Sequence, residues 1–186
     1  MILKRLFDLA LALPAAFVLA LPIAVVALAV RLTSPGPALY WSDRVGRHNR
    51  IFRMPKFRSM RIDTPAVATH LLPNPAQWLT PIGPFLRKSS LDELPQLLNI
   101  MRGEMSVIGP RPVTAGEMQR YGADVPFYIA VRPGVLGLWQ VRGRNKLTYT
   151  QRVAYDVEYV ETWSIWQDFK IILLAIPVVL LGRGAY

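Results

Sequence analysis

The residues best suited to chemistry are the adjacent carboxylates Asp92 and Glu93, in the stretch SSLDELPQLLNI. An ionised aspartate can act as a nucleophile or as a magnesium ligand. The leucines that follow predict a buried helix, so a helix cap is the alternative role. With Ser90 as the N-cap, Glu93 completes a capping box; with Asp92 as the cap, Pro95 lies early enough in the helix to be tolerated. In either arrangement we expect the helix dipole to lower the pKa of the carboxylates.

Basic residues occur in four clusters around this acidic pair. They are Lys56 and Arg58 in KFRSM, Arg87 and Lys88 in LRKSS, Arg111 in IGPRPV, and Arg132, Arg142 and Arg144 in VRPGVLGLWQVRGRN. Guanidinium groups bind phosphate oxygens in pairs, and rigid Gly/Pro turns hold them in place. Each cluster alone is better explained as a solvated basic face or a contact with lipid head groups. Together with the acidic pair, they indicate phosphoryl transfer assisted by a divalent metal.

The composition limits the partners of such a site. The chain has 186 residues, 22 Lys and Arg against 12 Asp and Glu, and a formal net charge of +10. This excess indicates anionic partners, namely nucleic acid, anionic lipids or phosphorylated substrates. The absence of cysteine excludes disulfides and thiolate metal sites. His48 and His70 lie far apart in the sequence and indicate no histidine-rich metal cluster.

Residues 9–30, LALALPAAFVLALPIAVVALAV, form an apolar run without charge that is long enough to cross a bilayer. A cleaved signal peptide fits poorly, because the run is long and no small-residue cleavage site precedes Arg31. Pro14 and Pro22 argue against a straight helix. Basic residues flank both ends, and the positive-inside rule then places both ends on the cytoplasmic side. This favours a re-entrant hairpin broken near Pro22, with a kinked transmembrane helix as the alternative.

The remaining sequence predicts a compact, mostly α-helical domain with short β and irregular segments. Short strands are expected at 38–41 and 51–54, and helices at 92–103, 113–122 and 147–162. The apolar run 171–181 is too short to span a membrane and is interrupted by Pro177, so it predicts either an amphipathic segment at the interface or a buried core helix. We therefore expect a membrane hairpin over 1–34 and a membrane-seated domain over 35–186.

Six stretches, in this order, resemble those of the bacterial sugar transferases known as monotopic phosphoglycosyl transferases. They are KRLFD, SPGPALYWSDRVG, KFRSM, LRKSSLDELPQLLNIMRGEMSVIGPRP, RPGVLGLWQVRGRN and YDVEYV…WSIWQDFKII, and they extend from about residue 4 to residue 172. The resemblance implies transfer of a sugar 1-phosphate from a nucleotide diphosphosugar, usually a UDP-sugar, to a polyprenyl phosphate such as undecaprenyl phosphate. The nucleoside monophosphate is released and assembly of a surface glycan begins, on the cytoplasmic face of the bacterial inner membrane.

The resemblance also implies roles for individual residues. Asp92 is the implied nucleophile of a two-step route through a phosphosugar-aspartyl intermediate. Glu93 is implied to hold Mg²⁺ (or Mn²⁺) together with Asp92, or to orient the acceptor phosphate. The hairpin break is assigned to Pro22, although Leu21 stands where some relatives place serine. The implied phosphate- and substrate-binding residues are Lys56, Arg58, Arg87, Arg111, Arg132, Arg144 and Asn145.

The expected partners are thus a nucleotide diphosphosugar, polyprenyl phosphate and inner-membrane phospholipids, without nucleic acid. A membrane-anchored, basic nucleic-acid-binding or scaffold protein is the main alternative. It explains the charge and the anchor, but it predicts aromatic residues interleaved with the basic ones and gives the acidic pair no purpose. A polytopic sugar transferase needs several long apolar segments, whereas this chain has one. The identity of the sugar and the existence of a homodimer stay open.

Overall fold

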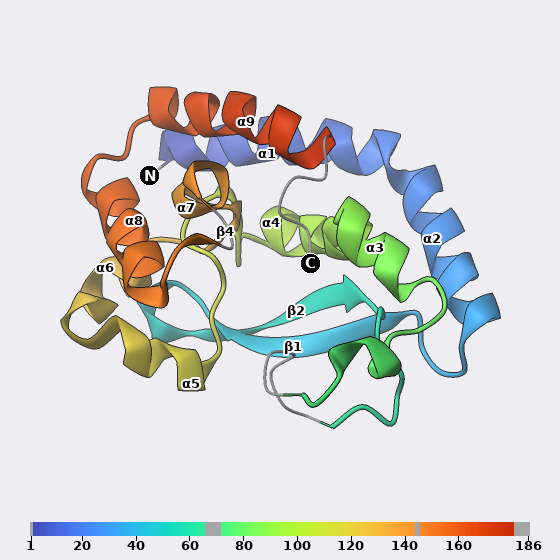
Figure 1. Ribbon diagram of the computed structural model, residues 1–186. Coiled ribbons are helices and arrows are strands. Elements are labelled where there is room, and N and C mark those ends of the chain that lie inside the picture. Colours follow the sequence, from blue (N-terminus) through green and yellow to red (C-terminus); the bar gives the residue numbers. More distant parts are fainter. Residues whose placement is uncertain (1, 66–71, 144–145, 181–186) are drawn as a thin grey trace.

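The computed structural model describes residues 2–65, 72–143 and 146–180, which form a mostly helical fold with two small sheets (Figure 1). In chain order the elements, with η denoting a 3₁₀ helix, are α1 (Ile2–Val18), α2 (Ala20–Thr33), β1 (Leu39–Val45), η1 (Arg47–Asn49), β2 (Ile51–Phe57), η3 (Pro75–Trp78), α3 (Gly83–Ser89), η4 (Leu91–Gln96), α4 (Leu97–Arg102), β3 (Ser106–Ile108), α5 (Ala115–Met118), η5 (Gln119–Asp124), α6 (Val125–Ala130), β4 (Gly134–Leu136), α7 (Leu138–Arg142), α8 (Tyr149–Glu161) and α9 (Ile165–Leu180). The predicted fold class, mostly α with short β segments, is confirmed.

Helices α1 and α2 form a pair bent by 60° at Leu19. The bend lies one turn before Pro22 and not at Pro22 itself. Because Pro22 has no N–H and its ring crowds the carbonyl group four residues earlier, the distortion falls at Val18 and Leu19. Pro14 lies inside α1 without ending it. Among the described residues no single helix is long and apolar enough to cross a membrane, but the bent pair meets these criteria of length and composition together.

Helix α1 is joined to the rest of the fold by a buried polar cluster, here called the Lys4 cluster. Lys4 Nζ lies 2.7 Å from Asp168 Oδ2 in α9 and 3.6 Å from Asp8 Oδ1 in α1. Asp8 Oδ1 accepts hydrogen bonds from Ser106 Oγ (2.8 Å) and the Val107 amide (3.0 Å) in β3. Both carboxylates are fully buried, so a single ammonium group serves two acids inside the protein.

Helix α9 lies beside α1 (Figure 1) and packs one of its faces into the core, while its place at a membrane interface stays a prediction. Ile171 and Ala175 are buried, and Ile171 belongs to a core cluster with Ile108, Leu138 and Tyr159. The opposite side of α9 exposes large apolar residues, which are Trp166, Phe169, Leu173, Leu174 and Ile176. The helix is therefore a core element on one face and an apolar surface on the other.

Strands β1 and β2 form an antiparallel hairpin in which Leu39 pairs with Phe57 and Val45 with Ile51. Both strands extend further along the chain than the sequence predicted, because the pairing between them is continuous from one end of the hairpin to the other. His48 and Asn49 adopt positive φ angles of 58° and 59° in the connecting turn. The hairpin forms one wall of the pocket described below.

Strands β3 and β4 are parallel neighbours that approach each other at two glycines. A Cβ atom on Gly109 would lie 2.9 Å from the Gly134 nitrogen, and one on Gly134 would overlap Gly109. The Gly134 amide donates to the Pro110 carbonyl at 2.8 Å. Glycine is required at both positions, since this close contact holds the turn that carries Arg111.

The segment predicted as a helix over 92–103 is divided into η4 and α4. Pro95 lies inside η4, and the α-helix begins only at Leu97, after the proline. Ser90 has a φ angle of 57°, and its side chain makes no capping hydrogen bond within the described residues. Both predicted capping arrangements are therefore wrong. The helix expected over 113–122 is likewise divided into α5 and η5, whereas the one expected over 147–162 matches α8.

Asp156 in α8 gives the fold a measurable dependence on pH. It is 3% exposed, and its Oδ2 accepts a 2.7 Å hydrogen bond from the Tyr121 hydroxyl. Burial raises the pKa of Asp156 to about 7, despite that hydrogen bond and the charge of Arg111. The unfolded chain titrates this group near pH ~4, so the folded state retains a proton that the unfolded state releases. The contribution to stability is full below that value and is lost as pH rises through about 7.

We therefore expect Asp156→Asn to flatten the pH dependence of unfolding. The wild type should lose about 4 kcal/mol from this group between pH ~4 and pH ~8, and the variant should not. Denaturant unfolding of both proteins at several pH values gives the difference between their free energies of unfolding. The contributions of the other carboxylates cancel in this difference. If the free energies of unfolding of the two proteins depended on pH in the same way, the raised pKa of Asp156 would be contradicted.

Candidate active site

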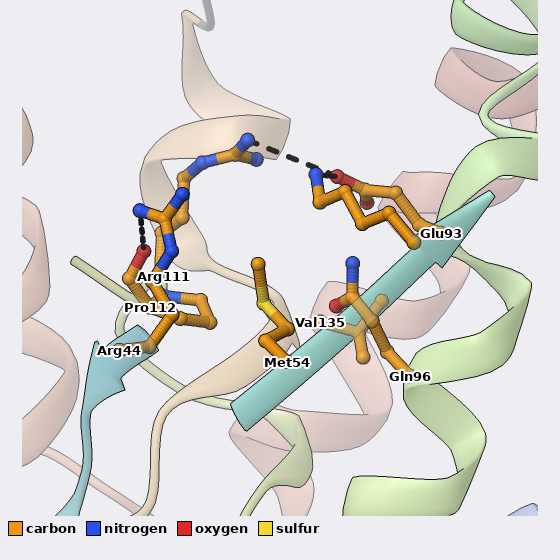
Figure 2. Close-up of a pocket in the computed structure, with 8 residues that line it drawn as sticks. Arg44, Met54, Glu93, Gln96, Arg111, Pro112 and Val135 are labelled. Atoms are coloured by element: carbon orange, nitrogen blue, oxygen red, sulfur yellow. Dashed lines mark hydrogen bonds and ion pairs between the residues drawn. The ribbon is translucent and has the colours of Figure 1, made fainter. Parts of the chain in front are cut away.

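A small polar pocket lies between the hairpin, η4 and the turn after β3. Its lining residues are Arg44, Met54, Lys56, Glu93, Gln96, Arg111, Pro112 and Val135. Figure 2 shows Arg44, Arg111 and Pro112 on one side, Glu93 and Gln96 on the other, and Met54 and Val135 between them. Segments far apart in the sequence thus build one site.

Strand geometry explains how the hairpin reaches the pocket. Met54 and Lys56 are two residues apart on β2 and therefore share a face. Ser42 of β1 is paired with Met54, which brings Arg44, two residues further along β1, to that same face. The hairpin thus contributes one apolar and two cationic side chains to the pocket.

Glu93 lies at the centre of the charges in the pocket. Its Oε1 is 2.6 Å from Lys56 Nζ and 3.8 Å from an Arg111 guanidinium nitrogen. The side chains of Lys56 and Glu93 are 21% and 20% exposed, and that of Arg111 is 40% exposed. The three charged groups are therefore reached by solvent, yet their ion pairs are partly shielded from water.

Asp92 lies beside Glu93 in η4 and is half-buried. Burial raises the pKa of Asp92 above its ordinary value, and the charge of Glu93 raises it further. The nearby charges of Lys56, Arg87 and Arg111 act in the opposite direction. The predicted lowering of this pKa is thus wrong, because the dyad lies in a 3₁₀ helix within the protein and not at an exposed α-helix N-terminus.

The structure brings together three of the predicted phosphate-binding residues. Lys56 and Arg111 line the pocket, and Arg87, at the end of α3, acts on the charge of Asp92. Arg87 Nε also donates a 3.0 Å hydrogen bond to Ser59 Oγ. These three cations come from separate elements and surround the acidic pair.

Two other predicted residues have different partners. Arg58 is buried and donates from Nε to the Pro37 carbonyl (2.7 Å) and from a terminal nitrogen to the Ser34 carbonyl (3.0 Å). Since β2 ends at Phe57, Arg58 turns back toward the end of α2 instead of joining Lys56. Arg132 Nε donates to the Gly103 carbonyl at 2.6 Å. Neither residue lines the pocket, so their phosphate-binding role stays a prediction, as does that of Arg144 and Asn145, which lie outside the described residues.

Four lining residues were not predicted from the sequence as members of the site: Arg44, Met54, Gln96 and Val135. Alternation along SDRVG and RMPKF was a usable signal for Arg44 and Met54, since it places them on one face with Lys56. Gln96 and Val135 carried no comparable signal, because their position depends on how η4 and β4 pack.

At the pocket, the carboxylates that could hold a metal are those of the dyad. Among the described residues, no group of three or more acidic or histidine side chains is arranged to hold an ion. Mg²⁺ commonly takes one or two protein carboxylates and completes its shell with water and substrate phosphates. The carboxylates of Asp92 and Glu93 fit that kind of ion, with Lys56 as a competing partner of Glu93. The metal stays a prediction.

Comparison with known proteins gives consistent matches over nearly the whole chain. Residues 1–182 match the bacterial sugar transferase family. A UDP-galactose-lipid carrier transferase of Erwinia amylovora is 44% identical over 99% of this chain and 42% of its own length. An exopolysaccharide production protein, ExoY, of Rhizobium meliloti is 43% identical over 98% of this chain and 88% of its own. A UDP-glucose:undecaprenyl-phosphate glucose-1-phosphate transferase of Caulobacter vibrioides is 42% identical over 98% of this chain and 72% of its own. The chain spans less than half the length of the Erwinia protein, but most of the other two.

Proposed function

The chain belongs to the bacterial sugar transferase family, as its sequence motifs predicted, and from this premise we propose that it transfers a sugar 1-phosphate from a UDP-sugar to undecaprenyl phosphate. The observation that carries the proposal is the acidic pair of η4 surrounded by Lys56, Arg87 and Arg111. Chemistry on a diphosphate requires such charge neutralisation. Relatives named for galactose and glucose phosphate transfer to undecaprenyl phosphate support the same reaction.

In the proposed mechanism, an Asp92 carboxylate oxygen attacks the phosphorus that carries the sugar. The bond from this phosphorus to the bridging oxygen breaks, and UMP leaves with that oxygen. A phosphate oxygen of undecaprenyl phosphate then attacks the same phosphorus, which releases Asp92 and forms the lipid-linked diphosphosugar. Lys56, Arg87 and Arg111 stabilise the charge on the phosphoryl oxygens in both steps.

Mg²⁺ (or Mn²⁺), when bound by Asp92 and Glu93, would supply further neutralisation of phosphate charge. In its absence Glu93 orients Lys56, to which it is joined at 2.6 Å. Glu93 thus keeps the ammonium group of Lys56 directed at the phosphates. The same ion pair neutralises the Glu93 carboxylate and so weakens its repulsion of the phosphates.

Release of UMP from a panel of UDP-sugars, with and without undecaprenyl phosphate and Mg²⁺, tests the function. We expect a single-turnover burst of UMP with donor alone and continuous release when the acceptor is added. Continuous release that depends on the acceptor but gives no burst would overturn the covalent route. No release with any donor, together with tight binding to nucleic acid, would favour the basic binding-protein alternative.

We further propose that α1 and α2 enter the cytoplasmic leaflet of the inner membrane and return to the same side. Both ends of the bent pair are attached to one folded body: Lys4 and Asp8 bond to α9 and β3, and the Ser34 carbonyl bonds to Arg58. Between these ends the pair exposes large apolar side chains, among them Leu13, Phe17, Val18, Leu21, Val25 and Leu28. A chain tethered at both ends in this way cannot place them on opposite faces without unfolding.

Single-cysteine labelling tests this topology, because the chain has no native cysteine. Ile2→Cys and Thr33→Cys place a thiol at either end of the pair, on exposed residues outside the Lys4 cluster. We expect a membrane-impermeant maleimide to label both only when the cytoplasmic face is opened. Asp43→Cys, exposed on β1, is the reference for the domain side. Labelling of Ile2→Cys and Thr33→Cys from opposite faces would show a spanning helix instead.

A further inference from the structure

Arg44 is the pocket cation that neither the acidic pair nor the proposed mechanism accounts for. Its Nε donates to Ser42 Oγ at 3.1 Å, and one terminal nitrogen lies 3.3 Å from the Pro112 carbonyl and 3.4 Å from Glu117 Oε2. The side chain is 22% exposed and lies with Arg111 on the side of the pocket opposite Glu93 (Figure 2). The guanidinium is thus held in one orientation at the edge of the pocket.

The charges that line the pocket do not balance. Arg44, Lys56 and Arg111 supply three cations, while Glu93 is the one acid among the described lining residues. Burial lowers the pKa of Arg44, the charge of Arg111 lowers it further, and Glu117 offsets this only in part. Two guanidinium groups kept close together and partly shielded from water are stabilised by an anion placed between them.

Glu117, which does not line the pocket, holds the Arg44 guanidinium in position. Its Oε2 accepts hydrogen bonds from the Thr114 amide (2.9 Å) and Thr114 Oγ1 (3.0 Å) in the capping box of α5, and the same atom faces Arg44. Because the cap anchors the carboxylate to the backbone, Glu117 holds the guanidinium in place and is not itself a pocket residue.

We propose that Arg44 binds the second phosphate of the diphosphate donor, the one that leaves with the nucleoside, and that Glu117 is its positioning residue. This rests on the proposed function. Arg111 reaches from the side of the pocket that holds Arg44 to the side that holds Glu93. Its guanidinium lies 3.8 Å from Glu93 Oε1, and its neighbour Pro112 turns a carbonyl toward Arg44. A phosphate attacked by Asp92 lies on the side of the dyad, so the neighbouring phosphate of the same diphosphate extends past Arg111 toward Arg44. Arg44 then stabilises the charge that develops on the departing phosphate.

Kinetics of Arg44→Ala with each substrate varied in turn test the assignment. Loss of one charge-assisted hydrogen bond should raise the donor KM about 10- to 100-fold and weaken inhibition by UMP to a similar extent. The KM for undecaprenyl phosphate should change less than about twofold. Arg44→Lys should recover part of the loss, because lysine restores the positive charge but not the paired N–H donors of the guanidinium. Glu117→Gln, which keeps the capping geometry, should shift the donor KM in the same direction by a smaller factor.

Arg47→Ala is the matched control, since Arg47 lies in the same hairpin and bonds to the exposed Ala130 carbonyl at 3.0 Å. It should leave both KM values and UMP inhibition unchanged. A donor KM unaffected by Arg44→Ala, or a rise confined to the acceptor KM, overturns the proposal.

Calorimetric binding of UDP separates this proposal from the proposed function. If wild type binds UDP and Arg44→Lys binds it more weakly while melting at the same temperature, the phosphate site stands even if no UDP-sugar is turned over. If UDP binds equally to wild type, Arg44→Lys and Glu117→Gln, the site is wrong even if UMP release proceeds. The conservative variants keep the test valid should Arg44→Ala fail to fold.

Discussion

Asp92→Asn is expected to lower the rate of UMP release by about four to six orders of magnitude, the range over which an enzyme loses activity when one member of its catalytic unit is removed. Asparagine keeps the shape of the side chain but cannot form the aspartyl intermediate. Intact-protein mass spectrometry after mixing with the UDP-sugar alone should show an added sugar phosphate in the wild type. The same measurement on Asp92→Asn should show the unmodified mass.

Asp43→Asn is the matched control, since Asp43 is an exposed aspartate of β1. It should retain full activity and form the adduct. A fully active Asp92→Asn, or an adduct mapped to another residue, would remove Asp92 from the role of nucleophile. Partial activity in Asp92→Asn with no adduct would point to direct transfer from donor to acceptor.

The raised pKa of Asp92 also predicts where UMP release is lost on the acid side of its pH profile. Attack requires the ionised carboxylate, and burial raises the pKa of Asp92. Activity should therefore fall, as pH decreases, at a higher pH than an ordinary aspartate would allow. Since the charge of Glu93 also raises this pKa, this loss should move to lower pH in Glu93→Gln.

Much of this site could be predicted from the sequence, because the signals were local or were carried by a known family pattern. The bent apolar pair, the hairpin, and the grouping of Lys56, Arg87 and Arg111 about the dyad follow from apolar runs, alternation and motifs. The prediction of one α-helix over 92–103 was wrong for a local reason. Pro95 delays the α-helix to Leu97, and a 3₁₀ helix carries the carboxylates instead.

What could not be predicted depended on contacts between distant segments. The sequence places Arg58 two residues from Lys56, but only the packed end of α2 shows that two of its guanidinium nitrogens donate to backbone carbonyls. The burial that raises the pKa of Asp92 is likewise a tertiary effect. The same holds for Lys4, which reads as a flanking charge of a membrane segment and proves to be buried between two acids.

The Lys4 cluster leads to the largest expected effect on stability. Lys4→Met keeps most of the side-chain volume but leaves Asp8 and Asp168, both fully buried, without their shared cation. Breaking a buried ion pair by removing one partner typically costs about 3–5 kcal/mol, because an uncompensated charge stays inside the protein. Denaturant unfolding in detergent should show a loss of that size.

Arg142→Met is the matched control for that measurement. Arg142 lies 2.9 Å from Glu158, almost as close as Lys4 to Asp168, but its side chain is 48% exposed and that of Lys4 only 10%. An exposed pair contributes about 1 kcal/mol or less, so the two substitutions separate burial from proximity. Adding Asp168→Asn to Lys4→Met removes one of the two unpaired charges and should recover part of the stability. Equal losses for Lys4→Met and Arg142→Met would mean that the Lys4 cluster does not hold α1 against α9. In that case the bent pair would be held to the folded body by polar contacts at its C-terminal end and not at its N-terminal end.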